Sequence, residues 1–231
     1  MPDRVRITDV SPRDGLQNEP GVIPTADKVR LVELLSQTGV DEVEVTSFVS
    51  PKWVPQLGDA AEVFAALKGK SVGLIYSALV PNEQGMAAAV KVNGQRRLLD
   101  KVSVFTAASE TFSHKNTNAS IAESIKRFEP VIARARSERL AVRGYISCAI
   151  ACPFEGPIAP DKVAQVAQVL ADVGCDEIDL GDTIRADEPE TITFLIHAMI
   201  ARLGDAIFKN TTLHLHDTFG RASECVREAL Q

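Results

Sequence analysis

The stretch PDKVAQVAQVLADVGCDEIDL, residues 160–180, predicts one helix followed by one strand, and this unit decides the fold. Pro160 stands at a position typical of the first turn of a helix, and the helix is expected over Asp161–Val173. Cys175–Leu180 then reads as a short strand. The same alternation continues in both directions along the chain, which predicts a parallel sheet with helices outside it.

The complete pattern has seven strands, each followed by a helix. The strands are expected over Val5–Val10, Val40–Thr46, Val72–Leu79, Lys101–Phe105, Ala141–Cys148, Cys175–Leu180 and Thr211–His216. The helices are expected over Ala26–Thr38, Asp59–Leu67, Glu83–Val90, Ile121–Ser137, Asp161–Val173, Pro189–Leu203 and Arg221–Leu230. In a chain of 231 residues, this predicts one incomplete TIM (β/α)8 barrel domain over residues 1–231, without its eighth βα unit.

A doubly wound open sheet is the alternative fold. Such a sheet would carry a glycine-rich phosphate-binding loop after its first strand. The turn at that place reads PRDGLQ, residues 12–17, which is not such a loop. The barrel is therefore the favoured architecture, and the missing strand indicates a truncated chain, a fragment, or a barrel completed by a partner.

The composition narrows the class of protein. The net charge of −6 argues against a general nucleic-acid binder, and no apolar run approaches the length of a membrane span. Four cysteines are present, but their spacing matches neither a disulfide framework nor a closed zinc site. These features predict a cytoplasmic enzyme in a reducing compartment, with no membrane partner.

Ionisable residues follow several of the predicted strands, at the barrel face where chemistry is expected. His214 and His216 are two positions apart on one strand, so both imidazoles should point to the same side. Asp14, after the first strand, would complete a two-histidine, one-carboxylate metal site. The alternative is a pair of structural histidines that are hydrogen-bonded to the backbone.

Three further charged residues lie at strand ends. Arg13 could bind a carboxylate or stabilise an enolate oxygen, or it could form a salt bridge with Glu44 or Asp182. Glu44 and Asp182 could be acid–base groups, or they could orient Arg13 or metal-bound water. For Glu44 the orienting role is favoured.

Several runs of the sequence resemble one known family. SPRDGLQNE, residues 11–19, and EVTSFVSPKWVPQ, residues 44–56, are similar to the first two strand segments of 3-hydroxy-3-methylglutaryl-CoA lyases. Later runs are similar to further blocks of the same family: RGYISC at 143–148, CPFEG at 152–156, LGDTI at 180–184 and HLHDTFG at 214–220. The resemblance covers the whole chain.

The resemblance implies a divalent-metal lyase of leucine catabolism. Asp14, His214 and His216 would bind Mg²⁺ or Mn²⁺ together with an Asn from the eighth strand. The acyl-CoA substrate would be cleaved in a retro-Claisen sense to acetyl-CoA and acetoacetate, and Arg13 would stabilise the enolate. Family members are commonly homodimers. By the same resemblance Gln17, Asn116, Tyr145 and Asp182 match positions around the substrate pocket. With the strand-end positions, the expected catalytic residues are Arg13, Glu44 and Asp182.

The sequence also departs from the family pattern. The metal-binding Asn and a catalytic Cys loop would lie beyond Gln231. Arg185-Ala186-Asp187-Glu188 should place bulk and charge at the barrel mouth, and Lys91–Leu99 reads as a long connection before the fourth strand. A Claisen-type synthase that condenses an acyl-CoA with a 2-oxo acid is an alternative, as is an inactive fragment.

Overall fold

The structure is a computed structural model that describes residues 4–231, apart from the side chains of residues 206 and 207. The chain divides into two compact units. The N-terminal unit comprises residues 4–104 and 133–141, and the C-terminal unit comprises residues 105–132 and 142–231. The expectation of one domain over residues 1–231 stays a prediction, and its residues 1–3 lie outside the described part.

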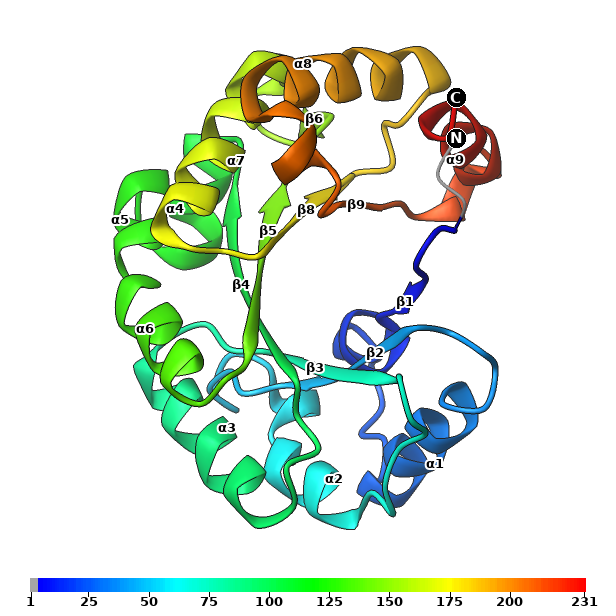
Figure 1. Cartoon of the computed structure of the whole chain (residues 1–231), viewed down its shortest axis with the longest axis vertical. Coiled ribbons are helices and arrows are strands. Elements are labelled where there is room, and N and C mark those ends of the chain that lie inside the picture. The colour runs from blue at the N-terminus through cyan, green and yellow to red at the C-terminus, as the bar shows by residue number, and fades with distance from the viewer. Residues whose placement is uncertain (1–3) are drawn as a thin grey trace. The chain divides into compact units, whose positions relative to one another are not determined.

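The N-terminal unit contains the first strands of the parallel sheet and the helices between them (Figure 1). The strands are β1 (Thr8–Asp9), β2 (Glu42–Ser47), β3 (Ile75–Leu79) and the start of β4 (Lys101–Ala107), and each is parallel to the strand before it. The helices are α1 (Thr25–Leu35), α2 (Ala60–Ala66), α3 (Glu83–Arg96) and the end of α6 (Glu129–Ser137). Two short turns, a π-helical one over Ser11–Gly15 and a 3₁₀ one over Pro55–Leu57, complete the unit.

The C-terminal unit continues the same strand–helix alternation, and its strands are ordered β4-β5-β8-β9. They are the end of β4, then β5 (Ala141–Ser147), β8 (Glu177–Gly181) and β9 (Thr211–His214). Its helices are α4 (Glu110–Thr117), α5 (Ile121–Lys126), the start of α6, α7 (Pro160–Val173), α8 (Pro189–Phe208) and α9 (Ala222–Ala229). A two-stranded antiparallel hairpin, β6 (Ala151–Cys152) with β7 (Gly156–Pro157), precedes α7, and a 3₁₀ turn over Asp217–Phe219 precedes α9. Within residues 4–231 the parallel strands number seven, as predicted.

Helix α7 shows how the sequence builds the helices that pack against the sheet of the C-terminal unit. Pro160 begins the helix, and Gly174 ends it with φ of 106°, a left-handed conformation that glycine adopts without strain. The apolar stripe of α7 is buried, and α7 packs beside α8 on the outside of β8 (Figure 1). Gly144 in β5 permits this close approach, since a Cβ there would lie 3.0 Å from Leu170 Cδ1.

Several elements differ from the sequence-based expectation. The helix expected over Glu83–Val90 extends to Arg96, so most of the expected connection over Lys91–Leu99 is helical. The single helix expected over Ile121–Ser137 is two helices, because Pro130 cannot donate the backbone hydrogen bond that a helix interior requires and is tolerated only in a first turn. Helix α4 and the β6–β7 hairpin were not predicted; both lie in connections after strands.

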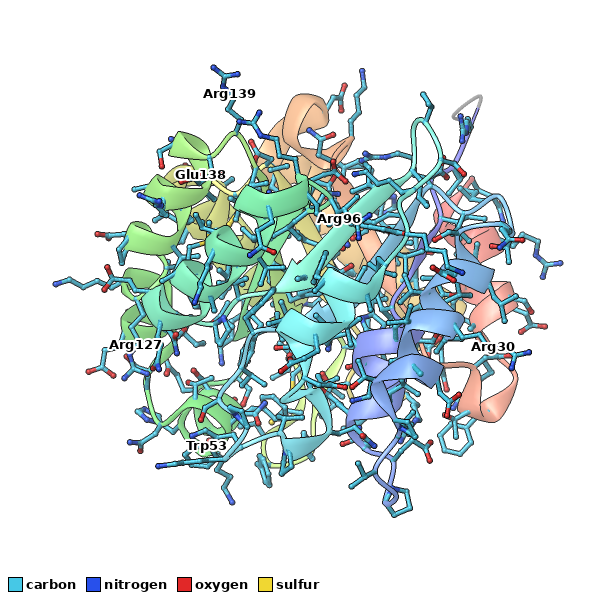
Figure 2. The ribbon with its side chains drawn as sticks, turned by 90° about the horizontal axis from the view of Figure 1, so that it is seen from below. Arg30, Trp53, Arg96, Arg127, Glu138 and Arg139 are labelled. Atoms are coloured by element: carbon cyan, nitrogen blue, oxygen red, sulfur yellow. The ribbon has the colours of Figure 1, made fainter. Side chains whose placement is uncertain are left out.

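Side chains on the outer helices are charged and exposed, as Arg30 on α1 illustrates (Figure 2). Arg96, at the end of α3, donates hydrogen bonds to the carbonyl oxygens of Ala65, Leu67 and Lys68 and so satisfies the carboxyl end of α2. Over the residues described, none of the helices combines the length and the apolar character needed to cross a lipid bilayer.

Candidate active site

Two histidines lie side by side at the end of β9. His214 is the last residue of the strand, and His216 continues with extended backbone, at φ −113° and ψ 113°. Side chains two positions apart on extended backbone point to the same side, and the two ring centroids lie 4.8 Å apart. The predicted pairing of the two imidazoles is therefore present within the C-terminal unit.

The backbone after β8 orients His216. Its Nδ1 lies 3.0 Å from the carbonyl oxygen of Asp182. A carbonyl oxygen only accepts hydrogen bonds, so Nδ1 carries the hydrogen, and the neutral ring presents Nε2 as a lone pair. This is the form in which an imidazole binds a metal ion, with its second nitrogen held by a backbone carbonyl.

The Asp182 side chain is buried, with 1% of the residue exposed. Its Oδ2 accepts a hydrogen bond of 2.9 Å from the backbone N–H of Asp187. Burial raises the pKa of Asp182, and the neighbouring Asp187 carboxyl raises that pKa further. Asp182 therefore holds a proton more readily than an exposed aspartate.

The Arg185–Glu188 segment differs from the expectation at one residue. Asp187 folds back against Asp182 and is 2% exposed, so its charge is not displayed on the surface. Arg185 is exposed and has a left-handed backbone with φ of 63°. The bulk expected from this segment is thus partly buried in the C-terminal unit.

In the N-terminal unit a π-helical turn, Ser11–Gly15, presents Arg13 and Asp14. The backbone N–H groups of both residues donate to the carbonyl oxygen of Val10, over 3.1 Å and 2.7 Å. These two hydrogen bonds to one carbonyl oxygen fix the turn directly after β1. Pro12 is tolerated there because it lies in the first turn of the helix.

Arg13 is buried between two carboxylates. Its Nε lies 2.6 Å from Glu44 Oε2, and its Nη1 lies 2.6 Å from Asp14 Oδ1. Arg13 is 6% exposed and Glu44 is fully buried. Glu44 thus makes the salt bridge that the sequence allowed, and this contact suits an orienting role. Whether Glu44 also takes part in proton transfer stays a prediction.

The remaining predicted site residues lie in different units. Gln17, in the N-terminal unit, donates from Nε2 to Asp14 Oδ1 over 3.2 Å. Tyr145, in the C-terminal unit, is buried in β5, with its ring edge-on to His214 at a centroid distance of 6.2 Å. Asn116 is exposed on α4. Their roles around a substrate stay predictions.

Sequence reasoning missed a polar network inside the C-terminal unit. Arg143 of β5 donates to Glu177 Oε2 of β8 over 2.9 Å, and Thr212 of β9 donates to Asp179 Oδ2 over 2.6 Å. Glu177 and Asp179 are both buried. They lie two positions apart in β8, so their side chains point to the same side of the strand. That spacing, on a strand already recognised, was the signal that could have revealed them.

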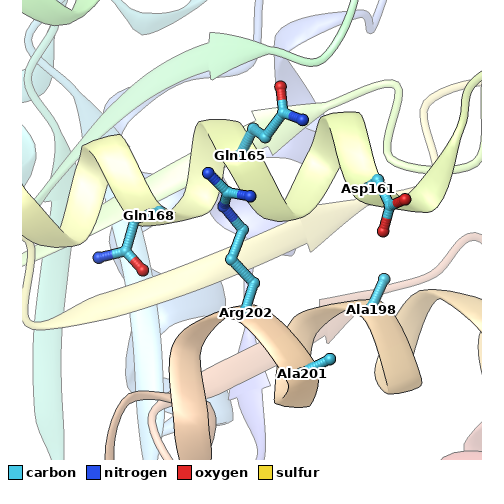
Figure 3. A pocket seen from close by; sticks show the side chains of 6 residues that line it. All are labelled: Asp161, Gln165, Gln168, Ala198, Ala201 and Arg202. Atoms are coloured by element: carbon cyan, nitrogen blue, oxygen red, sulfur yellow. The ribbon is translucent and has the colours of Figure 1, made fainter.

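A separate groove of about 560 Å³ lies between α7 and α8 (Figure 3). Figure 3 shows the Arg202 side chain extending from α8 toward α7, between Gln165 and Gln168. The groove is lined by Asp161, Gln165, Gln168, Ala198, Ala201 and Arg202. It belongs to the helical layer, whereas the candidate site residues follow strand ends, so the groove is not part of the candidate site.

Comparison with known proteins identifies relatives along the whole described chain. The profile of the HMGL-like family matches residues 4–231. The chain is 44% identical over 231 residues to the mitochondrial hydroxymethylglutaryl-CoA lyase of Rattus norvegicus, covering 100% of this chain and 68% of the relative. It is 46% identical over 222 residues to the 3-hydroxy-3-isohexenylglutaryl-CoA/hydroxy-methylglutaryl-CoA lyase of Pseudomonas aeruginosa, covering 96% of this chain and 71% of that protein.

A solved structure agrees with the fold. The HMG-CoA lyase of Brucella melitensis superposes with a TM-score of 0.91 at 46% identity, over 98% of this chain and 77% of that chain. The predicted α/β fold of the TIM-barrel type, with seven parallel strands among the described residues, is therefore confirmed.

Proposed function

Because the chain belongs to the HMGL-like family, we propose that it cleaves 3-hydroxy-3-methylglutaryl-CoA to acetyl-CoA and acetoacetate. The chain is 44% and 46% identical to two curated lyases, and this supports a carbon–carbon lyase as its enzyme class. The observation that carries the proposal within the structure is the histidine pair at the end of β9, with the Nδ1 of His216 held by a backbone carbonyl. The synthase alternative is not favoured, since these relatives are lyases.

We propose that His214 and His216, together with Asp14, hold a divalent cation, Mg²⁺ or Mn²⁺. The donor set fits such an ion: two adjacent imidazoles, one of them with Nε2 presented as a lone pair, and a carboxylate that is 23% exposed. When bound, the ion would supply Lewis-acid polarisation and hold the hydroxyl and carboxylate oxygens of the substrate.

The reaction requires an anionic oxygen to be stabilised. Removal of the tertiary hydroxyl proton allows the carbon–carbon bond to break, which leaves acetoacetate and the enolate of acetyl-CoA. We assign Arg13 to the enolate oxygen, because a buried guanidinium held by Glu44 is preorganised and needs no rearrangement as charge develops. Proton transfer to the enolate carbon then gives acetyl-CoA.

We assign Asp182 to the hydroxyl proton. Its carboxyl is buried, and its raised pKa means that the carboxylate binds a proton more tightly than an ordinary aspartate does. A general base works best when its pKa approaches the working pH, so the direction of the shift suits the role. Glu44 acts in this scheme by holding Arg13.

The substrate class follows from the relatives, which are named for glutaryl-CoA thioesters. We propose that Gln17, Asn116 and Tyr145 contact the acyl-CoA, and that the protein serves leucine catabolism in the cytoplasm, as a homodimer. The P. aeruginosa relative is named for two acyl groups, so a longer 3-alkyl substituent is a natural second substrate to test.

Turnover by this chain, with added Mn²⁺ or Mg²⁺, tests the proposal. Purified protein should release acetoacetate from 3-hydroxy-3-methylglutaryl-CoA, and the rate should fall to the uncatalysed level in a chelator. A panel of 2-oxo acids with acetyl-CoA should give no condensation product. Condensation without cleavage would replace the lyase assignment by the synthase, and absence of both reactions would favour an inactive fragment.

A further inference from the structure

We propose that Asp179 is a positioning residue that orients the imidazole of His214, so that Nδ1 carries the hydrogen and Nε2 is left to bind the metal ion. The inference rests on the proposed function, since it takes His214 as a metal ligand. It goes beyond that function by assigning a role to a buried carboxylate that the proposed reaction does not use.

The placement of Asp179 follows from strand register within the C-terminal unit. In the β5–β8 pair Tyr145 lies opposite Asp179, and in the β8–β9 pair Asp179 lies opposite Thr212. His214 is two positions after Thr212, so its side chain points to the same side of β9 as the Thr212 side chain. Three neighbouring strands therefore place Asp179 next to His214.

The Asp179 carboxylate is buried and is itself held in position. Its side chain is 7% exposed, and Oδ2 accepts a hydrogen bond of 2.6 Å from Thr212 Oγ1. The other oxygen, Oδ1, lies 3.9 Å from Nδ1 of His214, whose side chain is 16% exposed. Burial of a carboxylate is costly without polar neighbours, and the Thr212 hydroxyl and the His214 imidazole are two such neighbours of Asp179.

The contact of 3.9 Å is longer than a hydrogen bond. The ring of Tyr145 lies edge-on to the His214 ring, at a centroid distance of 6.2 Å. We expect the distance from His214 Nδ1 to Asp179 Oδ1 to shorten to about 3 Å when a metal ion binds, because a metal-bound imidazole donates its second N–H to a carboxylate or carbonyl.

The two histidines would then be oriented by different partners. His216 has a backbone carbonyl on Nδ1, whereas His214 has a carboxylate. A carboxylate partner raises the basicity of the imidazole and fixes its tautomer, and loss of such a partner weakens metal binding by roughly tenfold to a hundredfold. Asp179 is therefore expected to raise the affinity of the site for the metal ion.

The first experiment reads the tautomer directly. The sequence has four histidines, so ¹⁵N NMR of the ring nitrogens at pH 8 resolves them, and a His214→Gln variant assigns the signal of interest. In the unsubstituted protein His214 should carry its hydrogen on Nδ1. On titration with Zn²⁺, used as a diamagnetic probe, the Nε2 signal of His214 should shift.

The second experiment measures affinity. Binding of Mn²⁺, followed by electron paramagnetic resonance, should weaken roughly tenfold to a hundredfold in Asp179→Asn. A smaller loss is expected in Thr212→Val, which leaves the carboxylate in place but removes its hydroxyl donor. Asp161→Asn, a substitution in the α7–α8 groove, is the matched control and should bind Mn²⁺ like the unsubstituted protein.

The outcomes separate the two proposals. If Zn²⁺ leaves the Nε2 signal of His214 unchanged, His214 is not a ligand and the metal assignment of the proposed function is wrong. If that signal shifts but the hydrogen resides on Nε2 in the free protein, or Mn²⁺ affinity in both variants stays within about twofold, Asp179 has no positioning role. If Asp179→Asn does not fold, two measurements still test the positioning role: the His214 tautomer in the unsubstituted protein and the Mn²⁺ affinity of Thr212→Val.

Discussion

Arg13 shows how a single charge is accommodated in the interior. A buried guanidinium is costly unless carboxylates compensate it, and Glu44 and Asp14 both lie 2.6 Å from its nitrogens. The sequence predicted the salt bridge to Glu44 as one of two readings. It could not choose between them, because the choice depends on which strand end lies closest to the side chain.

Arg13→Met tests the catalytic assignment. Loss of one preorganised donor to a developing oxyanion lowers kcat by roughly 10²- to 10³-fold, and we expect that loss here in a steady-state assay of acetoacetate release. The exposed Arg30→Met on α1 is the matched control and should keep its kcat (Figure 2). An Arg13→Met enzyme with kcat within a few-fold of the unsubstituted protein would remove Arg13 from the chemistry.

At the scale of elements, the β6–β7 hairpin is joined to the start of α4 by one carboxylate. Glu155 Oε1 accepts from Ser109 Oγ over 2.7 Å and from the Thr111 backbone N–H over 2.8 Å. These bonds, led by the one from Thr111, lower the pKa of Glu155 to about 2. Neither element was predicted from sequence, since both are short and the contact that joins them links residues 46 positions apart.

Glu155 makes the stability of the protein sensitive to acid. Because its folded pKa of about 2 lies below the ordinary value of 4.5, its contribution is complete above pH 4.5 and is lost as the pH falls toward 2. We expect Glu155→Gln to destabilise the protein at pH 7, and the difference from the unsubstituted protein to shrink between pH 5 and about pH 3. Urea unfolding at several pH values measures this, and a difference independent of pH would contradict it.

Close packing of α7 on β5 depends on Gly144. A Cβ there would lie 3.0 Å from Leu170 Cδ1 and 3.1 Å from Cys175 Sγ. Overpacking of this kind costs about 1–3 kcal/mol, so Gly144→Ala should lower the free energy of unfolding by that amount.

Gly94→Ala is the matched control for Gly144→Ala. Gly94 lies in α3 and has no atom within 4 Å of an added Cβ. Alanine is the better helix former by about 1 kcal/mol, so this variant should be as stable as the unsubstituted protein or more stable. Denaturant unfolding of both variants gives the comparison, and equal effects at the two sites would refute the packing argument.

At the scale of the whole molecule, the proposed ligands come from both compact units. Asp14 belongs to the N-terminal unit, and His214 and His216 belong to the C-terminal unit. A ligand that binds only the folded state stabilises it by mass action, by about 2.7 kcal/mol at a hundred times its Kd. Binding of one ion by residues of both units would therefore raise the stability of the whole chain.

Thermal unfolding with Mn²⁺ and with a chelator tests this ligand set. Mn²⁺ should raise the Tm of the unsubstituted protein, and Asp14→Ala and His214→Ala should each abolish the increase, although they lie in different units. Glu33→Ala, on α1, is a control that should keep it. A metal-induced rise that survives Asp14→Ala would show that the N-terminal unit contributes no ligand.

Periodicity along the chain was sufficient to determine the order of the seven parallel strands and to place His214 and His216 on one side of their strand. These properties depend on local backbone geometry, because alternate residues of a strand share a side and helices have a period of 3.6 residues. The runs around Arg13 and Glu44 were likewise sufficient to indicate the family.

Only the tertiary structure decided which partners these residues have. It pairs Arg13 with Glu44, folds Asp187 against Asp182, and places Asp179 beside His214. Each of these contacts joins segments whose distance depends on strand register and loop closure, and a single sequence contains no direct record of either. The same reason explains why the sequence did not reveal Glu155 as the residue that joins the β6–β7 hairpin to α4, since Ser109 and Glu155 lie 46 positions apart.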